Sequence, residues 1–174
     1  MKKELSIIIP TIEYKQQAIE YKHEHLNNGE DVIIGSSGLH NYEVYEEWLD
    51  YIENLRNDKV SGWPPVTTYF GVYNDNIIGM INIKHRLNEN WREHINYGVR
   101  PSERRKGYAT KMLALALNEC ERLGLKRVFM SIDKDNVGSV KVLIKNGGIL
   151  ESEYTEDDGE IGQWYWIDVI CCKK

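Results

Sequence analysis

The stretch Val99–Thr110, which reads VRPSERRKGYAT, decides the fold of this chain because it joins an apolar strand to a long amphipathic helix. Three cations, Arg104, Arg105 and Lys106, precede Gly107 at the join. Each cation opposes the helix dipole at that end by roughly 0.3–1 kcal/mol, and a glycine in a helical turn costs about 1 kcal/mol relative to alanine. Residues that break local rules in this way tend to mark functional sites.

This turn has two interpretations. In the first, a polyanion rests on the helix start, where unpaired backbone N–H groups and the helix dipole attract it. Gly107 has no Cβ and would let the ligand come close. In the second, the turn is an ordinary solvated basic segment whose charge is offset by Glu103. The number of local rules broken at one point favours the polyanion site.

Length and composition predict one globular domain over residues 1–174. A chain of this size buries roughly 70% of its unfolded surface and needs no disulfide or metal to hold it together. The formal net charge of −5 argues against general nucleic-acid binding, which requires a basic face. We therefore expect no nucleic-acid partner, and the same charge is compatible with a cationic small molecule.

The cysteine and histidine patterns predict neither a disulfide framework nor a metal site. Three cysteines occur, Cys120, Cys171 and Cys172, without a C-x-x-C pair, which favours a reducing compartment. The histidines form no H-x-x-x-H set, so we expect no metal. The first apolar run, Ile7–Ile9, ends at Pro10 and is too short for a signal segment or a membrane span. We expect a cytoplasmic protein without a membrane partner.

Hydrophobic periodicity and turn residues predict the element order β-α-α-β-β-β-α-β-α-β-β. The expected strands cover residues 5–9, 67–73, 77–85, 93–99, 127–132, 149–155 and 162–171, and the expected helices cover residues 11–26, 41–55, 109–123 and 136–146. The strand–helix–strand unit around the 99–110 stretch predicts two parallel strands. Gly98 predicts a bulge or the close approach of another backbone. The order is typical of a mixed α+β fold and not of a doubly wound one.

This order, with Arg104-x-x-Gly107-x-Ala109 at its centre, resembles the GNAT family of acyl-CoA N-acyltransferases, whose pattern at this point is Gln/Arg-x-x-Gly-x-Gly/Ala. A second stretch also resembles the family, with a strand over 128–132, then Asn136-x-x-Ser139, then Lys-Asn-Gly at 145–147. The resemblance implies an α+β fold with a mixed, mostly antiparallel central sheet and helices on both faces.

The resemblance also implies that acetyl-CoA is the cosubstrate and that backbone amides of the turn bind its pyrophosphate. By position, this role falls to Arg104, Arg105, Lys106, Gly107, Tyr108, Ala109 and Thr110. The preceding strand, at Val99, would splay from its neighbour and pair with the pantetheine arm, and Asn136 and Ser139 would contact the cofactor from the next helix. A strand N–H within residues 97–99 would hold the thioester oxygen as negative charge develops on it.

The implied reaction is direct attack of a primary amine on acetyl-CoA in a ternary complex. It needs a base, because a lysine-like amine has a pKa of about 10.4 and is protonated at neutral pH. His94 and Glu93 open the strand that leads to the turn, and strand alternation places their side chains on opposite faces. Tyr97, on the same strand, is the third candidate catalytic residue.

One family feature is missing. Many members carry a tyrosine four residues before the glycine that is Gly147 here, and that tyrosine protonates the leaving thiolate; in this chain the position is Leu143. Tyr97, Tyr154, Tyr165 or solvent would have to replace it. A thiol with a pKa of about 8.5 is a modest leaving group at neutral pH, so a dedicated acid is not essential.

The acceptor amine leaves weaker signals. The acidic run over 151–160 is either a steering surface for a cationic amine or the solvated tip of a hairpin. Tyr42, Tyr45, Trp48 and Trp63 either line an acceptor pocket or pack in the core, and the spacing of Tyr45 and Trp48 favours the core.

Together these features predict an acetyl-CoA-dependent N-acetyltransferase of a small-molecule or protein amine, acting as a monomer or homodimer. The alternative is a non-catalytic acyl-CoA-binding or regulatory module, which Leu143 in place of the tyrosine would favour.

Overall fold

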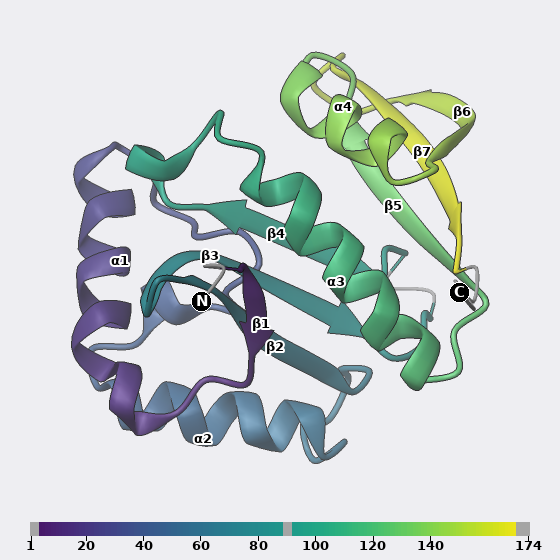
Figure 1. Ribbon diagram of the computed structural model, residues 1–174. Coiled ribbons are helices and arrows are strands. Elements are labelled where there is room, and N and C mark those ends of the chain that lie inside the picture. The colour runs from purple at the N-terminus through teal and green to yellow at the C-terminus, as the bar shows by residue number, and fades with distance from the viewer. Residues whose placement is uncertain (1–3, 89–91, 170–174) are drawn as a thin grey trace.

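The computed structural model describes residues 4–88 and 92–169, which form two antiparallel sheets and four α-helices (Figure 1). The first sheet has the order β1 (Ser6–Ile8), β2 (Val66–Tyr73), β3 (Asn76–Lys84), β4 (Ile95–Val99). The second has the order β5 (Arg127–Asp133), β7 (Ile161–Asp168), β6 (Ile149–Thr155). The predicted order of strands and helices and the mixed α+β class are confirmed.

The helices are α1 (Lys15–Asn27), α2 (Tyr45–Arg56), α3 (Tyr108–Arg122) and α4 (Val137–Lys145), with short 3₁₀ turns η1 (Ile12–Tyr14), η2 (Leu39–Asn41) and η3 (Pro101–Glu103). The expected start of the second helix near residue 41 is wrong. Asn41 ends η2, and α2 begins four residues later with Val44 as its N-cap. No helix in the described ranges is long and apolar enough to cross a membrane.

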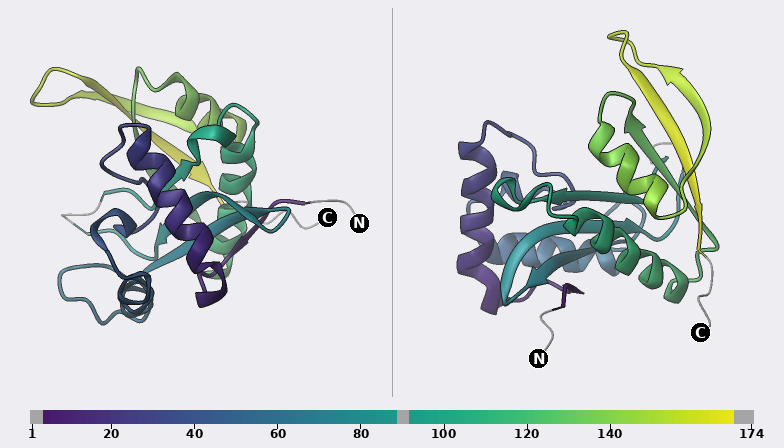
Figure 2. Two further views of the ribbon diagram at one scale, coloured as in Figure 1. Left: turned by 90° about the vertical axis from the view of Figure 1, so that its left-hand side faces the viewer. Right: turned by 45° about the horizontal axis from the view of Figure 1, so that its top comes forward.

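Helices cover both faces of the first sheet, and each face has its own core (Figure 2). Side chains of β3 alternate between them: Met80 packs with α1 and α2, whereas Ile81 and Ile83 pack with α3. Tyr45 and Trp48 of α2 are 3% and 0% exposed, which confirms their expected core role. The core under α3 continues through Leu143 to the second sheet.

The two sheets meet at one point and then separate. The N–H of His94 donates to the carbonyl of Phe129 at 2.8 Å, and the N–H of Phe129 donates to His94 Nδ1 at 2.9 Å. Beyond this junction β4 and β5 belong to different sheets and diverge in Figure 1. The expected strand–helix–strand unit is present as β4–α3–β5, but its two strands do not pair: within the described strands every pairing is antiparallel, because β4 pairs with β3 and β5 pairs with β7.

Gly98 is explained by a close backbone approach and not by a bulge. The register of β4 on β3 is regular across Gly98, which lies opposite Met80. A Cβ on Gly98 would lie 2.7 Å from the carbonyl oxygen of Ile34. A Cβ on Gly35, which has φ +80°, would lie 2.5 Å from the carbonyl oxygen of Met80. The two glycines therefore let the segment between α1 and α2 lie directly on the face of the sheet.

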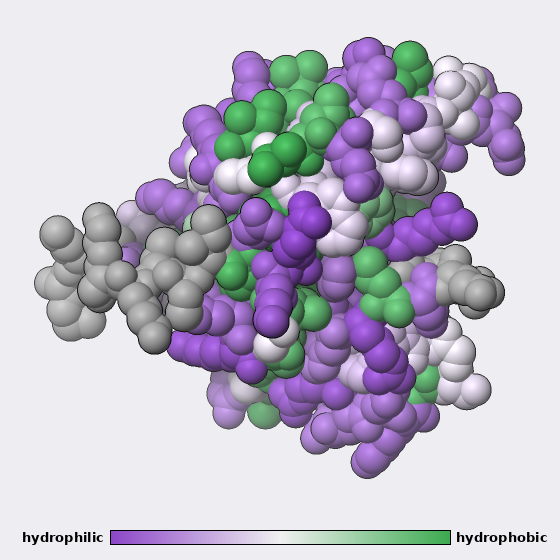
Figure 3. Space-filling view, turned by 90° about the vertical axis from the view of Figure 1, so that its right-hand side faces the viewer, coloured by the Kyte–Doolittle hydropathy of each residue, from purple (hydrophilic) through white to green (hydrophobic). Residues whose placement is uncertain are grey.

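The second sheet ends in a long hairpin, and the last residues of its expected strand, 170 and 171, lie outside the described range, as does Cys172. Figure 3 shows apolar side chains gathered at the top of the face that α4 and this sheet present. The exposed apolar residues of α4, β6 and β7 are Val137, Ile144, Ile149, Leu150 and Ile161.

Candidate active site

The turn before α3 leaves the start of the helix open. Gly107 is the N-cap residue with φ +81°, and Arg105 has φ +65°. Within the described residues no side chain caps the helix, and no heavy atom lies within 4 Å of the position that a Cβ on Gly107 would occupy. The N–H groups of the first turn therefore point into open space at the positive end of the helix dipole. This geometry fits a pyrophosphate group.

The three cations of the turn do not form an unpaired cluster. Lys106 pairs with Glu103 at 3.0 Å, in agreement with the solvated-turn interpretation for that residue. Arg104 is engaged by Glu30. Arg105 is exposed and pairs with no carboxylate in the described parts of the chain. The groups left to hold a phosphate are the main-chain amides and Arg105.

Arg104 positions the end of β4. Its guanidinium binds both carboxylate oxygens of Glu30, at 2.7 and 2.8 Å, and its Nε donates to the carbonyl of Val99 at 3.0 Å. This pairing with Arg104 is the main cause that lowers the pKa of Glu30 to about 2. Glu24 of α1 binds the other end of the connection, through Arg100 Nε at 2.6 Å and the N–H of Ser102 at 2.7 Å.

β4 turns the N–H groups of Tyr97 and Val99 away from β3. The N–H of Arg100 donates to the carbonyl of Ile78 in β3 at 2.8 Å. Because the residues of an antiparallel strand alternate between bonding the neighbour and pointing outward, Tyr97 and Val99 expose their N–H groups on the opposite edge. That edge pairs with no other described strand, because β5 belongs to the other sheet and diverges from β4 (Figure 1). A thioester oxygen at this edge would find backbone donors there.

His94 connects the two sheets. Its ring is 6% exposed and its Nδ1 accepts the N–H of Phe129. Burial lowers the pKa of His94 to about 4, and the charge of Lys84 adds to the effect. His94 is therefore neutral near pH 7, and one ring nitrogen is already used in a structural hydrogen bond, which suits a positioning residue better than a general base.

Tyr97 and the predicted cofactor residues of α4 lie together. Tyr97 Oη is buried and has no hydrogen bond of normal length to the described residues. Burial raises the pKa of Tyr97, and the neighbouring Ser139 hydroxyl partly offsets this. Asn136 caps α4, because its Oδ1 accepts the N–H of Ser139 at 3.1 Å. Leu143 is fully buried one turn further along α4.

A hydrogen bond links the C-terminal end of α4 to the first turn of α3. Asn146, directly after α4, donates from Nδ2 to the carbonyls of Thr110 and Val142 at 3.2 and 2.9 Å. Tyr108 packs against Tyr73 of β2, with tilted rings whose centroids are 5.5 Å apart. Asn146 of the Lys-Asn-Gly segment therefore holds the first turn of α3, which follows the predicted cofactor-binding turn.

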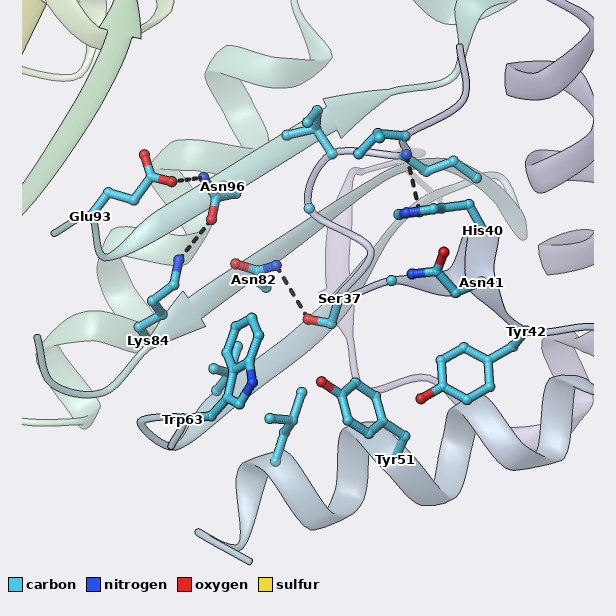
Figure 4. A pocket seen from close by; sticks show the side chains of 17 residues that line it. Ser37, His40, Asn41, Tyr42, Tyr51, Trp63, Asn82, Lys84, Glu93 and Asn96 are labelled. Carbon is cyan, nitrogen blue, oxygen red and sulfur yellow. Dashed lines mark hydrogen bonds between the residues drawn. The ribbon is translucent and has the colours of Figure 1, made fainter. Parts of the chain in front are cut away.

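A pocket of about 640 Å³ lies beside β4 on the face covered by α1 and α2 (Figure 4). The segment 32–42, α2, Trp63, β3 and the start of β4 enclose it. Tyr42 and Trp63 line it as one interpretation of the sequence expected, and Tyr51 joins them. The acidic residues of 151–160 do not line it, and those that the structure describes are exposed on the β6–β7 hairpin.

A chain of polar side chains forms the end of the pocket nearest β4. Lys84 Nζ donates to Asn96 Oδ1 at 2.8 Å, and Asn96 Nδ2 donates to Glu93 Oε1 at 2.7 Å. Lys84 is 4% exposed, and burial lowers its pKa while the charge of Glu93 opposes the shift. Of the candidate bases Glu93 and His94, Glu93 lines the pocket and His94 does not; both precede β4, which begins at Ile95 and not at Glu93 as expected, so strand alternation does not explain the difference.

Sequence reasoning missed Asn82, Lys84 and Asn96 in the pocket and Glu30 at the turn. A signal existed for the first two, because Asn82 and Lys84 interrupt an otherwise apolar strand two residues apart and so share one face with Met80. Glu30 gave no such signal, because its partner Arg104 is distant in sequence.

Comparison with known proteins agrees with this geometry. The family model described as Acetyltransferase (GNAT) family matches residues 28–147, more than half of the chain. No curated protein matches the sequence closely enough to count as a relative.

Several solved structures share the fold at low sequence identity. The microcin C7 self-immunity acetyltransferase MccE, solved with acetyl-CoA and AMP, is 16% identical with a TM-score of 0.68, covering 97% of this chain and 93% of its own. RimL, a ribosomal L7/L12 α-N-protein acetyltransferase solved with coenzyme A, is 14% identical with a TM-score of 0.69, covering 98% and 97%. A chimeric spermidine N-acetyltransferase SpeG from Vibrio cholerae is 16% identical with a TM-score of 0.63, covering 95% of each chain.

The fold and the open helix start define an acyl-CoA N-acyltransferase. The chain belongs to the GNAT acetyltransferase family, as the family model shows. The predicted class of enzyme, an acetyl-CoA-dependent N-acetyltransferase, and its cosubstrate are confirmed by this membership.

Proposed function

We propose that this protein transfers the acetyl group of acetyl-CoA to a primary amine by direct attack in a ternary complex. One arrangement carries the proposal: the uncapped start of α3 follows β4, whose outer edge pairs with no other described strand, and Glu93 and Asn96, just before and within β4, line the pocket on the face covered by α1 and α2. The cosubstrate would lie along the unpaired edge of β4 and the amine would occupy the pocket.

The residues proposed to bind the pyrophosphate are the amides of Gly107, Tyr108, Ala109 and Thr110 with the exposed cation of Arg105. Arg104 holds Val99 in place through Glu30 and acts as a positioning residue. Asn136 and Ser139 would contact the cosubstrate from α4, and Lys106 lies at the rim of the turn.

In the proposed reaction, the thioester supplies a carbonyl carbon, which the amine nitrogen attacks as the carbon–sulfur bond breaks. The outward N–H groups of Tyr97 and Val99 would stabilise charge on the carbonyl oxygen. Glu93 would take the amine proton, directly or through water. Tyr97 Oη, which has no hydrogen bond of normal length to the described residues, would give a proton to the leaving thiolate in place of the tyrosine that Leu143 replaces.

The test is thiol release from acetyl-CoA and propionyl-CoA with a broad panel of primary amines, run beside thermal shifts with coenzyme A. We expect a melting-temperature increase with the cofactor and turnover with at least one amine. Glu93→Gln keeps the shape of the side chain and the Asn96 contact, so we expect cofactor binding without comparable turnover. Cofactor binding with no thiol release for any amine would instead support the non-catalytic acyl-CoA-binding module.

A further inference from the structure

The pocket beside β4 has two chemically different ends (Figure 4). Asn82, Lys84, Glu93 and Asn96 lie at the end next to β4, where the reaction is proposed to occur. The lining also carries aromatic side chains: the tilted rings of Tyr42 and Tyr51 lie at the far end with centroids 5.6 Å apart, and Trp63 lies between them and the side chains of Asn82 and Lys84. A ligand that fills this pocket meets polar groups at one end and flat apolar surfaces at the other.

The side-chain oxygen of Asn82 is a buried acceptor that a hydrogen-bond donor on the ligand could satisfy. The side chain is 8% exposed, its Nδ2 donates to Ser37 Oγ at 3.2 Å, and its Oδ1 has no hydrogen bond within the described residues. Figure 4 shows this oxygen turned toward the Lys84 and Asn96 side chains. Leaving a buried acceptor unmatched costs free energy, so a ligand N–H at this point would be favourable.

The charges in the pocket select against an acceptor with several cations. Lys84 and Glu93 are the charged residues among those that line it, and burial lowers the pKa of His40, which keeps that side chain neutral near pH 7. A polyamine would therefore meet one carboxylate, already bonded to Asn96, and one buried ammonium that repels it. The Lys84 charge also favours the neutral, reactive form of a single amine nearby.

The size of the pocket fits a small molecule with a ring. A volume of about 640 Å³ lies within the range typical of small-ligand sites. Aromatic walls bind flat groups by offset or edge-to-face stacking, which a bare alkyl chain does not reproduce.

We propose that the acceptor is an aromatic monoamine: a flat ring held between Trp63 and the Tyr42–Tyr51 pair, joined by a short chain to one primary amine that donates to Asn82 Oδ1. This inference rests on the proposed function. It excludes polyamines and polypeptide N-termini as the preferred acceptors.

The experiment compares four acceptors at saturating acetyl-CoA by thiol release: 2-phenylethylamine, hexylamine, spermidine and a peptide that begins with serine. We expect the highest kcat/KM for 2-phenylethylamine, by about tenfold or more over each of the others, as one good stacking or hydrogen-bonding interaction would give. Hexylamine carries the same amine without a ring and isolates the contribution of the aromatic end.

Two variants and a control test the contacts. Trp63→Ala should remove the preference for 2-phenylethylamine over hexylamine, and Asn82→Ala should raise KM for both by about tenfold. Asn54→Ala is the matched control, because Asn54 is an exposed amide on α2 that does not line the pocket. It should leave both constants within about twofold. Thermal shifts with coenzyme A check that every variant is folded and binds the cofactor.

The outcomes separate this inference from the proposed function. Turnover that is fastest with spermidine or the peptide, and unchanged in Trp63→Ala, overturns the acceptor class and leaves the transferase function standing. Thiol release with no amine contradicts the transferase function itself. In that case calorimetric titration of 2-phenylethylamine into the coenzyme A complex still tests the pocket: Trp63-dependent binding supports the inference, and its absence overturns it.

Discussion

Arg104 grips Glu30 with both terminal nitrogens of its guanidinium, at 2.7 and 2.8 Å, while its Nε holds the carbonyl of Val99. The arginine that opens the family motif therefore serves as a brace between the segment after α1 and the end of β4. Its charge is already paired, so we propose that it supports cofactor binding by fixing the turn and not by meeting a phosphate directly.

This relationship predicts that Glu30→Gln weakens coenzyme A binding although Glu30 lies outside the cofactor turn. We expect a loss of roughly three- to tenfold in affinity, since a part-exposed bidentate pair contributes modestly. The measurement is calorimetric titration with coenzyme A. Glu103→Gln, which removes the other carboxylate paired with this turn, is the control and should change affinity less. Equal losses in the two variants would show that general charge, and not the brace, determines the effect.

Gly107 and Gly124 allow a matched test of the cofactor turn, because they flank α3 with nearly the same backbone geometry. Their φ angles are +81° and +79°, and a Cβ on either would have no described heavy atom within 4 Å. Alanine at each should destabilise the fold by about 1–2 kcal/mol, the cost of the left-handed conformation. Only Gly107→Ala should also lose most of the thermal shift with acetyl-CoA. Loss of the shift in Gly124→Ala as well would trace it to stability alone.

The element order and the position of the cofactor-binding turn could be predicted from the sequence because both depend on local patterns. Glycines mark the ends of α3, hydrophobic periodicity marks its buried face, and Tyr45 and Trp48 repeat at core spacing. Local sequence patterns did not indicate that β4 separates from β5, because such patterns do not determine which strands lie side by side. The junction depends on His94 meeting Phe129, 35 residues later.

The pocket was only partly predictable for a similar reason. The sequence offered Tyr42 and Trp63 as candidates for an acceptor pocket. The face of β3 that carries Asn82 and Lys84 becomes part of that pocket only because the segment 32–38 lies over it. That contact depends on two glycines from distant parts of the chain: Gly35 lies against the backbone of Met80, and Gly98 lies against the backbone of Ile34. Periodicity indicates which residues share a face and not what lies opposite.

Tyr97→Phe should separate a chemical role from a structural one. Tyr97 Oη is buried without a hydrogen bond of normal length to the described residues, so its removal should leave the melting temperature unchanged or slightly higher. If the hydroxyl protonates the leaving thiolate, kcat should fall by about tenfold or more while coenzyme A affinity is kept. A thiol-release assay measures kcat, and thermal denaturation measures the melting temperature.

Tyr154→Phe is the control for this prediction. Tyr154 was an alternative acid, but its hydroxyl is bonded to Ser131 Oγ at 2.5 Å in the second sheet. Its loss should lower stability and leave kcat nearly unchanged. A larger fall in kcat for Tyr154→Phe than for Tyr97→Phe would reverse the assignment.

We expect the titration of His94 to change the free energy of unfolding with pH and not the pH dependence of kcat. Burial lowers its pKa from 6.5 to about 4, so the folded protein holds the neutral ring. The resulting contribution is fully present above pH 6.5 and is lost as the pH falls toward 4, because the unfolded chain binds the proton more readily. The loss amounts to roughly 3 kcal/mol over that range.

The measurement is the free energy of unfolding of the wild type and His94→Asn from pH 4 to 8. The asparagine Oδ1 can accept the N–H of Phe129 as Nδ1 does, without titrating. Other histidines with lowered pKa values contribute equally to both proteins, so the difference between the two curves isolates His94. We expect the wild type to lose about 3 kcal/mol of stability relative to the variant as the pH falls from 6.5 to 4, and the pH profile of kcat to keep its shape. A variant that keeps its folded-state stability but loses the acidic limb of that profile would instead identify His94, and not Glu93, as the base.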